Sequence, residues 1–235
     1  MTSARPDADV ALVVAAAGTG SRYSRDRSKL FEPLGDLLLF LHCLRSFAAV
    51  IPAERTVLVV GAAEHDRFAE ALRGFPGGST VRLVDGGASR AESVLRGLQA
   101  LPASAAFAAI HDAARPLASA DLLRRCIASA RDHGSGVAAR RVTDTIKVAD
   151  TGGVVLSTPD RSRLWAAETP QVFRADDLRR GYMEALCAGR APTDDAAAIE
   201  GLGLPVHLVE SFEPNPKITQ AGDLALVAAL SAPRG

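Results

Sequence analysis

Residues 11–22, ALVVAAAGTGSR, carry the strongest indication of architecture in this chain. An apolar run passes into small residues and then into Gly18 and Gly20, which is typical of a buried strand that feeds a tight turn. Small residues let the backbone approach a ligand closely, and the N–H groups of such a turn can bind an anion. Arg22 and Lys29 add full positive charge beside the turn. The stretch therefore predicts a site for a polyphosphate.

The turn differs from the two common phosphate-binding loops. The dinucleotide fingerprint G-x-G-x-x-G fails because Tyr23 occupies the position of the third glycine. The chain also has no Gly-Lys pair of the kind that kinase-type loops require. A dehydrogenase is therefore not favoured. Taken alone, the turn leaves a simpler interpretation open, a strand-to-helix connection with cations on its surface.

Length and composition are those of an ordinary globular domain. The 235 residues are 48% hydrophobic and 23% charged, which suffices for one sizeable core, so we expect a single domain over residues 1–235. Lys plus Arg equals Asp plus Glu at 27 each, and the net charge of zero argues against nucleic acid as a partner. The polar residues 1–9 predict a loose tail.

The chain shows no sign of a membrane span, a secretion signal or a structural zinc site. No apolar stretch approaches the length of about 18 residues that a span needs. Cys43, Cys126 and Cys187 lie in apolar helical patterns without CxxC spacing, and three buried thiols suit a reducing compartment. We therefore expect a cytoplasmic protein that does not bind membranes.

Strands and helices alternate along the chain. Predicted strands cover residues 56–61, 81–84, 107–111 and 206–209. Predicted helices cover residues 37–47 (capped by Asp36), 64–73, 89–101, 119–127 (capped by Ser119), 175–187, 195–202 (with an N-cap motif at residues 193–196) and 221–230. This alternation with short connections predicts an α/β fold, a mostly parallel sheet covered by helices on both faces. Three strands end in small or charged residues, at 16–22, 85–90 and 111–115. Ligands bind beyond the carboxyl ends of parallel strands, so these endings should meet in one pocket.

The alternation stops after Gly136. Apolar and polar residues alternate at period two over residues 142–148, which predicts a strand. Residues 150–153 predict a glycine turn, and residues 154–156 predict a second strand. Such a hairpin predicts a projecting β-arm over about residues 141–165. A lone hairpin is only marginally stable, so packing against a second subunit, as a homodimer, is the simple expectation. An edge hairpin folded back on its own chain remains the alternative.

Several motifs together resemble the 2-C-methyl-D-erythritol 4-phosphate cytidylyltransferase family. They appear in the order typical of that family and extend from residue 11 to about residue 230. The matching segments are residues 16–22 with Lys29, Gly86-Gly87 with Arg90, Ser93 and Val94, residues 111–116, 144–147, 169–171, 193–196 and 217–219. The resemblance implies a Rossmann-like nucleotidyltransferase sheet with a projecting β-hairpin arm.

The resemblance also implies a reaction. CTP and 2-C-methyl-D-erythritol 4-phosphate would give 4-diphosphocytidyl-2-C-methyl-D-erythritol and pyrophosphate in non-mevalonate isoprenoid biosynthesis. A phosphate oxygen of the acceptor attacks the α-phosphorus, so the chemistry needs charge neutralisation and alignment of two anions rather than a strong base. Magnesium would accompany the triphosphate.

The resemblance assigns a role to individual residues. The residues matching the catalytic cations are Arg22, Lys29 and Lys217. The residues matching the nucleotide site are Ala16, Ala17, Gly18, Thr19, Gly20, Gly87, Ser93, Asp112 and Ala113. The residues matching the acceptor site are Arg115, Thr145, Arg161 and Thr169, of which Thr145 and Arg161 would reach the partner's site in a dimer. Asp112 is the candidate metal ligand, with magnesium held mainly through the phosphates.

Some positions depart from the family pattern, and two other functions stay open. Ala15 and Ser28 stand where the family commonly has proline, and Ala88 stands where some members have an acidic residue near the base. One alternative is a cytidylyltransferase for another polyol phosphate, such as ribitol 5-phosphate. The other is a nucleotide-binding module without turnover.

Overall fold

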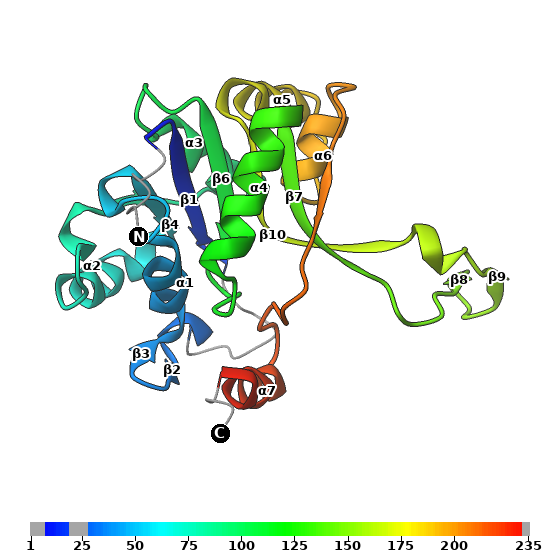
Figure 1. The fold of residues 1–235 in the computed structure, drawn as a ribbon, viewed down its shortest axis with the longest axis horizontal. Helices are drawn as coiled ribbons and strands as arrows, with labels where there is room; N and C mark the ends of the chain where they lie inside the picture. Colours follow the sequence, from blue (N-terminus) through cyan, green and yellow to red (C-terminus); the bar gives the residue numbers. More distant parts are fainter. Residues whose placement is uncertain (1–7, 19–27, 232–235) are drawn as a thin grey trace, which may run out of the picture.

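The computed structural model describes residues 8–18 and 28–231, and its centre is a seven-stranded sheet (Figure 1). The strands in spatial order are β11 (Leu208–Glu210), β7 (Ser135–Arg141), β10 (Trp165–Arg174), β6 (Phe107–Asp112), β1 (Val10–Ala16), β4 (Thr56–Val60) and β5 (Arg82–Asp85). Neighbouring strands run parallel except at β10, which is antiparallel to both β6 and β7. The expected mostly parallel α/β sheet is confirmed.

Strand β1 shows why both faces of the sheet carry helices. Val10, Leu12 and Val14 belong to one apolar core, whereas Ala11 and Val13 belong to the other. Successive side chains of a strand point to opposite faces, so a strand that is apolar throughout must be covered twice. The sequence pattern of β1 thus dictates a three-layered domain.

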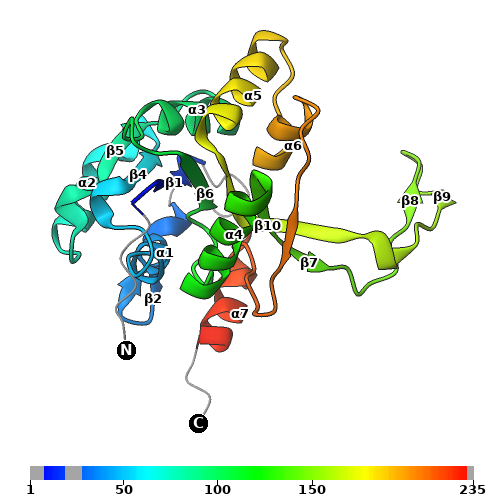
Figure 2. The same cartoon turned by 45° about the horizontal axis from the view of Figure 1, so that its top comes forward.

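Helices α1, α2 and α4 contribute to the first core, and α3, α5 and α6 contribute to the second (Figure 2). The helices are α1 (Leu39–Phe47), α2 (His65–Arg73), α3 (Arg90–Gln99), α4 (Ala120–His133), α5 (Ala175–Cys187), α6 (Asp195–Glu200) and α7 (Ala221–Ser231). The caps expected at α4 and at residues 193–196 are present: the side chain of Ser119 accepts from the N–H of Leu122, and that of Asp194 accepts from the N–H of Ala197.

The expected start of the first helix was wrong. Leu37 and Leu38 form strand β3 (Leu37–Leu38), which pairs with β2 (Pro33–Leu34), and α1 begins only at Leu39. Gly35 takes a φ of +61°, which a hairpin turn requires and glycine adopts without strain. Asp36 lies in this turn and pairs with Arg45 at 2.9 Å, so it does not cap the helix.

Strands β7 and β10 were not recognised in the sequence. Pro170 lies inside β10, and proline lacks the N–H that a central strand donates. The structure accommodates Pro170 where the pairing register between β10 and β7 shifts, between Ala167 and Gln171. The irregular pairing explains why apolar and polar residues do not alternate regularly along this central strand.

The arm leaves the sheet between the end of β7 and the start of β10, and it projects away from the body in both views (Figures 1 and 2). Its first strand, β8 (Val148–Ala149), is shorter than expected, because residues 142–147 are not a strand, whereas the second, β9 (Val155–Ser157), has the expected length and begins one residue later. The apolar side chains of Val154, Val155 and Leu156 are 64%, 53% and 65% exposed. Nothing in the described chain covers them, so the arm does not fold back on its own body.

Three smaller expectations have mixed outcomes. Residues 1–7 of the predicted tail lie outside the described residues, whereas Asp9 is bound, with Oδ1 2.5 Å from Arg131 Nη2. Cys43 and Cys126 are buried, but Cys187 is exposed, so the expectation of three buried thiols was wrong. Across residues 8–18 and 28–231, no helix combines the length and the apolar character needed to cross a bilayer.

Candidate active site

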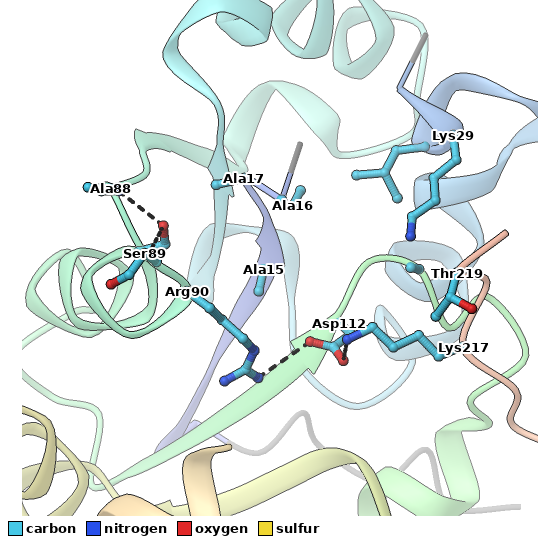
Figure 3. A pocket seen from close by; sticks show the side chains of 15 residues that line it. Ala15, Ala16, Ala17, Lys29, Ala88, Ser89, Arg90, Asp112, Lys217 and Thr219 are labelled. Atoms are coloured by element: carbon cyan, nitrogen blue, oxygen red, sulfur yellow. Dashed lines mark hydrogen bonds and ion pairs between the residues drawn. The ribbon is translucent and has the colours of Figure 1, made fainter. Parts of the chain in front are cut away.

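A pocket of about 420 Å³ lies at the carboxyl ends of β1, β5 and β6 (Figure 3). The residues predicted for the site that line it are Ala16, Ala17, Gly18, Lys29, Gly87, Ser93, Asp112 and Lys217. The three strand endings therefore do meet in one cavity. Thr19, Gly20 and Arg22 lie outside the described residues.

The segment after β5 is held tightly against the first turn of α3. A Cβ atom on Gly86 would come within 2.5 Å of the Cβ of Ala17, and one on Gly87 would come within 2.4 Å of the Cβ of Glu92. The Ser93 hydroxyl accepts from the N–H of Gly87 at 3.0 Å and donates to the carbonyl of Ser89 at 2.8 Å. This wall of the pocket needs glycines because its backbone approaches both β1 and α3.

A cluster of opposite charges occupies the other wall. Lys217 Nζ lies 2.7 Å from Asp112 Oδ2, and Arg90 Nη2 lies 3.4 Å from Asp112 Oδ1. Figure 3 shows the two cations reaching Asp112 from opposite sides. Burial alone would raise the pKa of Asp112, but Arg90 and Lys217 hold that pKa at about 2. Asp112 is therefore ionised, and it fixes both cations at the pocket.

Lys29 enters the same pocket from a different part of the chain. It begins the short 3-10 helix Lys29–Phe31, and its Nζ donates to the carbonyl of Ile218 at 2.5 Å. The N–H of Ile218 donates to the carbonyl of Ala114, which ties the segment after Lys217 to the end of β6. Lys29 and Lys217 thus line one cavity from opposite ends of the sequence.

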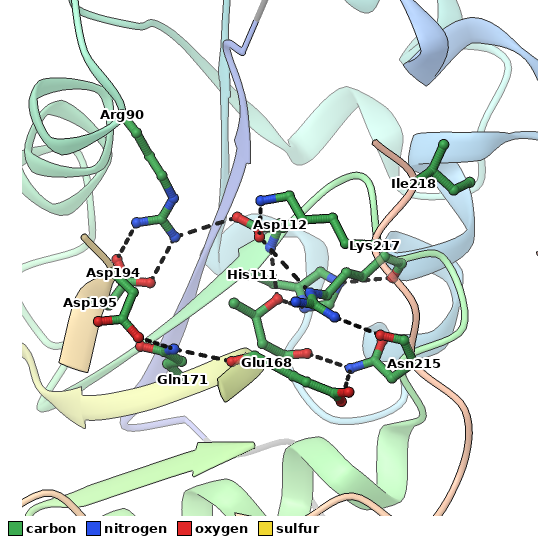
Figure 4. A network of polar contacts seen from close by, with 12 residues as sticks. Arg90, His111, Asp112, Glu168, Gln171, Asp194, Asp195, Asn215, Lys217 and Ile218 are labelled. Atoms are coloured by element: carbon green, nitrogen blue, oxygen red, sulfur yellow. Dashed lines mark hydrogen bonds and ion pairs between the residues drawn. The ribbon is translucent and has the colours of Figure 1, made fainter. Parts of the chain in front are cut away.

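Arg90 is oriented by a fully buried carboxylate that the sequence interpretation treated only as part of a helix cap. Asp195 binds its guanidinium twice, at 3.1 Å and 2.8 Å (Figure 4). Tyr182 donates to the same carboxylate at 2.5 Å. Burial lowers the pKa of Arg90, but Asp195 and Asp112 outweigh that effect and raise it. Both residues belong to segments that carry the family resemblance, but nothing in the sequence pairs one with the other.

The residues predicted for the acceptor site fall into two groups. Thr169 and Arg115 lie in the body near Asp112, with Thr169 4% exposed and the Arg115 side chain 13% exposed. Thr145 and Arg161 are exposed on the arm and do not line the pocket of their own chain. The Arg161 guanidinium donates to the carbonyl of Thr143 at 2.8 Å.

Ala113 does not line the pocket. Its side chain is fully buried in the core, and its N–H donates to the carbonyl of Ala15. The neighbouring Ala114 lines the pocket instead, together with Thr219, which was not predicted.

Asp112 is the one carboxylate among the described residues that line the pocket. The described chain contains no group of three or more His, Cys, Asp or Glu side chains that could hold a metal ion. Magnesium is commonly bound by one or two carboxylates together with substrate phosphates. The residues present fit that mode, with Asp112 as the protein ligand, and they do not form a cage of their own.

His111 provides a test of how the buried polar network responds to pH. Burial lowers the pKa of His111 from 6.5 to about 4, although the Asp112 carboxylate opposes that change. The unfolded chain therefore takes up a proton near pH 6.5 that the folded chain refuses, so stability is full above that pH and declines as pH falls toward 4. We expect the free energy of unfolding to fall by about 3 kcal/mol across this window.

Urea denaturation at a series of pH values measures this loss. The variant His111→Gln is the control, because it has no titrating ring and should show a shallower slope over the same window. Equal slopes in the two proteins would contradict the assignment to His111.

Known proteins resemble this chain along nearly its whole length. The family model for 2-C-methyl-D-erythritol 4-phosphate cytidylyltransferase matches residues 10–231. A relative of that name from Prochlorococcus marinus is 41% identical over 230 residues, which covers 95% of this chain and 98% of the relative. One from Thermosynechococcus vestitus is 42% identical over 219 residues, or 92% of each chain. The crystal structure of 4-diphosphocytidyl-2C-methyl-D-erythritol synthase from Anaerococcus prevotii matches with a TM-score of 0.80 at 25% identity, covering 94% of this chain and 96% of that one. The chain is thus similar to members of this family in both sequence and fold.

Proposed function

Because the chain belongs to the 2-C-methyl-D-erythritol 4-phosphate cytidylyltransferase family, we propose that it joins CTP to 2-C-methyl-D-erythritol 4-phosphate. The products are 4-diphosphocytidyl-2-C-methyl-D-erythritol and pyrophosphate, within non-mevalonate isoprenoid biosynthesis. The observation that carries this proposal is the convergence of Lys29, Lys217 and Arg90 on a single pocket around Asp112. A reaction between two phosphate anions needs such a concentration of positive charge.

The chemical step is an in-line displacement at phosphorus. A phosphate oxygen of the acceptor forms a bond to the α-phosphorus of CTP, and the bond from that phosphorus to the α–β bridging oxygen breaks, so pyrophosphate leaves with the electron pair. The acceptor phosphate is ionised near neutral pH, and the step needs no protein base. Lys29 and Lys217, with Arg22 as the third expected cation, neutralise the approaching anions and the departing charge.

The nucleotide lies against the alanine and glycine wall of the pocket. Ala16, Ala17 and Gly87 present backbone close to the cavity, and Ser93 fixes the Gly87 N–H. Backbone groups at such a wall can recognise the edge of a cytosine, for which large side chains would leave no room. Gly18, with Thr19 and Gly20 beyond it, is the expected contact for the triphosphate.

Asp112 would hold Mg²⁺ together with the triphosphate oxygens. When bound, the ion supplies further neutralisation of phosphate charge. Lys217 contacts one oxygen of Asp112 and Arg90 contacts the other, so these cations also set the orientation of that carboxylate.

The acceptor site is completed by a second copy of the chain, working in the cytoplasm as a homodimer. Arg115 and Thr169 lie beside Asp112 in the body, while Thr145 and Arg161 are carried on the arm. The exposed apolar tip of the arm, Val154–Leu156, supports this assembly because such a patch is normally covered.

Pyrophosphate release from purified protein with CTP and Mg²⁺ tests the function. We expect a clear preference for 2-C-methyl-D-erythritol 4-phosphate over ribitol 5-phosphate, and no release without an acceptor. Turnover with ribitol 5-phosphate alone would identify a different polyol-phosphate enzyme. Binding of CTP by calorimetry, with no pyrophosphate from either acceptor, would identify a module without turnover.

A further inference from the structure

The one fully buried imidazole of the described chain, His111, lies directly behind the pocket and has both ring nitrogens engaged. Nε2 lies 3.1 Å from the carbonyl oxygen of Arg115, and Nδ1 lies 3.0 Å from the hydroxyl oxygen of Thr169. The ring packs edge-on against Phe47, with centroids 4.8 Å apart. The imidazole therefore cannot turn without breaking contacts on two sides.

These contacts determine the tautomer. A carbonyl oxygen can only accept, so Nε2 carries the ring proton and donates it to Arg115. In a neutral ring, Nδ1 is then an acceptor, and the Thr169 hydroxyl must donate to it. Complete burial of the ring favours this neutral form.

The Thr169 hydroxyl passes this constraint to Asp112. Its oxygen accepts from the N–H of Asp112 at 3.1 Å, while its proton points to His111. The β6–β10 ladder ends at the pair Ile110 and Gln171. Because the strands are antiparallel, the next residue of β10 in the direction of Asp112 is Pro170, which has no N–H. The Thr169 hydroxyl, and not a backbone carbonyl of β10, thus accepts the hydrogen bond from the N–H of Asp112.

The same ring also holds the turn that follows β6. The N–H of Arg115 donates to the carbonyl of Asp112, and the Arg115 guanidinium donates to the carbonyl of Asn215 at 2.6 Å. The amide of Asn215 donates in turn to the carbonyl of Thr169 at 2.8 Å. Three separate segments, which carry Asp112, Thr169 and Lys217, are therefore joined around one imidazole (Figure 4).

We propose that His111 is a positioning residue for the reaction: as the Nε2–H tautomer it orients the Thr169 hydroxyl and the Arg115 carbonyl, and through them it aligns Asp112 with Lys217 and Arg90. This inference rests on the proposed function, and it assigns Thr169 a role that does not require contact with the acceptor. The proton and one lone pair of its hydroxyl are committed to His111 and Asp112. The contribution of Thr169 is to fix the backbone beneath the carboxylate.

Substitutions at Thr169 test the relay with little change in side-chain size. Thr169→Val removes the hydroxyl but keeps the shape, which leaves the N–H of Asp112 and Nδ1 of His111 unpaired, and kcat should fall by about tenfold to a hundredfold. Thr169→Ser keeps the hydroxyl and should stay within about threefold of wild type. The KM for CTP should change little in either variant, because the nucleotide wall lies on the opposite side of the pocket.

A double-mutant cycle separates this relay from a general loss of stability. His111→Gln removes the Nδ1 acceptor and should lower kcat about as much as Thr169→Val. Because the two residues act through one contact, the double variant should be no more than about threefold slower than either single variant. Calorimetric CTP binding on each variant shows that the protein assayed is folded.

Two results would overturn the proposal. If the kcat losses of His111→Gln and Thr169→Val multiply, the residues act independently, as they would if Thr169 only touched the acceptor. If Thr169→Val turns over at the wild-type rate, the relay has no role in catalysis. The Thr169 pair keeps the test valid even if His111→Gln fails to fold.

A measurement without substrates distinguishes failure of this inference from failure of the proposed function. In ¹⁵N-histidine-labelled, ligand-free wild-type protein, the buried ring should give the NMR signature of a neutral imidazole protonated at Nε2. A ring protonated at Nδ1 would overturn the relay whatever reaction the protein catalyses. The expected tautomer in a protein that releases no pyrophosphate would instead mean that the proposed reaction is wrong.

Discussion

Lys217→Met should lower kcat by about a hundredfold to a thousandfold, the loss typical of removing one group that stabilises transition-state charge. Lys217 Nζ lies 2.7 Å from Asp112 Oδ2 at the wall of the pocket, and 38% of the Lys217 side-chain surface is exposed. Without it, the developing charge loses one of the cations that line the cavity, and Asp112 keeps only the more distant Arg90, at 3.4 Å, and Arg115, at 3.9 Å. Steady-state pyrophosphate release at saturating CTP measures the loss.

The matched control is Arg180→Met, which also removes one positive charge but from the outer side of α5, where Arg180 pairs with Asp177 at 3.2 Å. It should keep wild-type kcat, because a solvated surface pair contributes little. Lys217→Arg should not restore the full rate, since a guanidinium fork does not replace a compact ammonium at a fixed position. A Lys217→Met enzyme with wild-type kcat would refute the catalytic role of this residue.

Two inactive variants should regain activity when they share one dimer. Arg161→Ala weakens the acceptor contact from the arm and should reduce kcat/KM by about tenfold to a hundredfold, whereas Lys217→Met inactivates the body. If the arm completes the partner's site, a mixed dimer joins one intact body to one intact arm. Isolated through two different affinity tags, this dimer should have about half of the wild-type activity, one working pocket out of two.

The control places both substitutions on a single chain and pairs it with a wild-type chain. In that dimer one pocket lacks Lys217 and the other receives an arm without Arg161, so the dimer should be nearly inactive. The reverse pattern, with activity only in the second mixed dimer, would mean that the arm serves its own chain. A monomer in size-exclusion chromatography at assay concentration would remove the premise of the experiment.

The sequence was sufficient for the parts of the fold that depend on local patterns. Residues 11–16 are apolar on both faces, and the capping residues Ser119 and Asp194 bind the N–H groups that their positions predict. The prediction that three strand endings meet in one pocket was also correct, because parallel strands bring their carboxyl ends to one edge.

The failures concern features that only tertiary structure determines. Asp36 resembles a helix cap, but the Gly35 turn lets residues 33–38 pair as a small hairpin first. The contact between Arg90 and Asp195 joins residues 105 positions apart, and no local spacing could reveal it. The side chain of Ala113, directly after β6, lies in the core and not at the pocket, so any ligand contact would have to come from its backbone.

Strand β10 extends from Trp165 at the root of the arm to Arg174 in the sheet, and Thr169 lies between them, where the register with β7 shifts. A single strand thus sets both the reach of the arm and the position of the hydroxyl that binds the N–H of Asp112. A gain or loss of one residue between Trp165 and Ala167, where the pairing with β7 is regular, would exchange the two faces of that segment, because side chains alternate at period two. The distance along the chain from the root of the arm to Thr169 is therefore constrained by strand pairing, as the length of a surface loop is not.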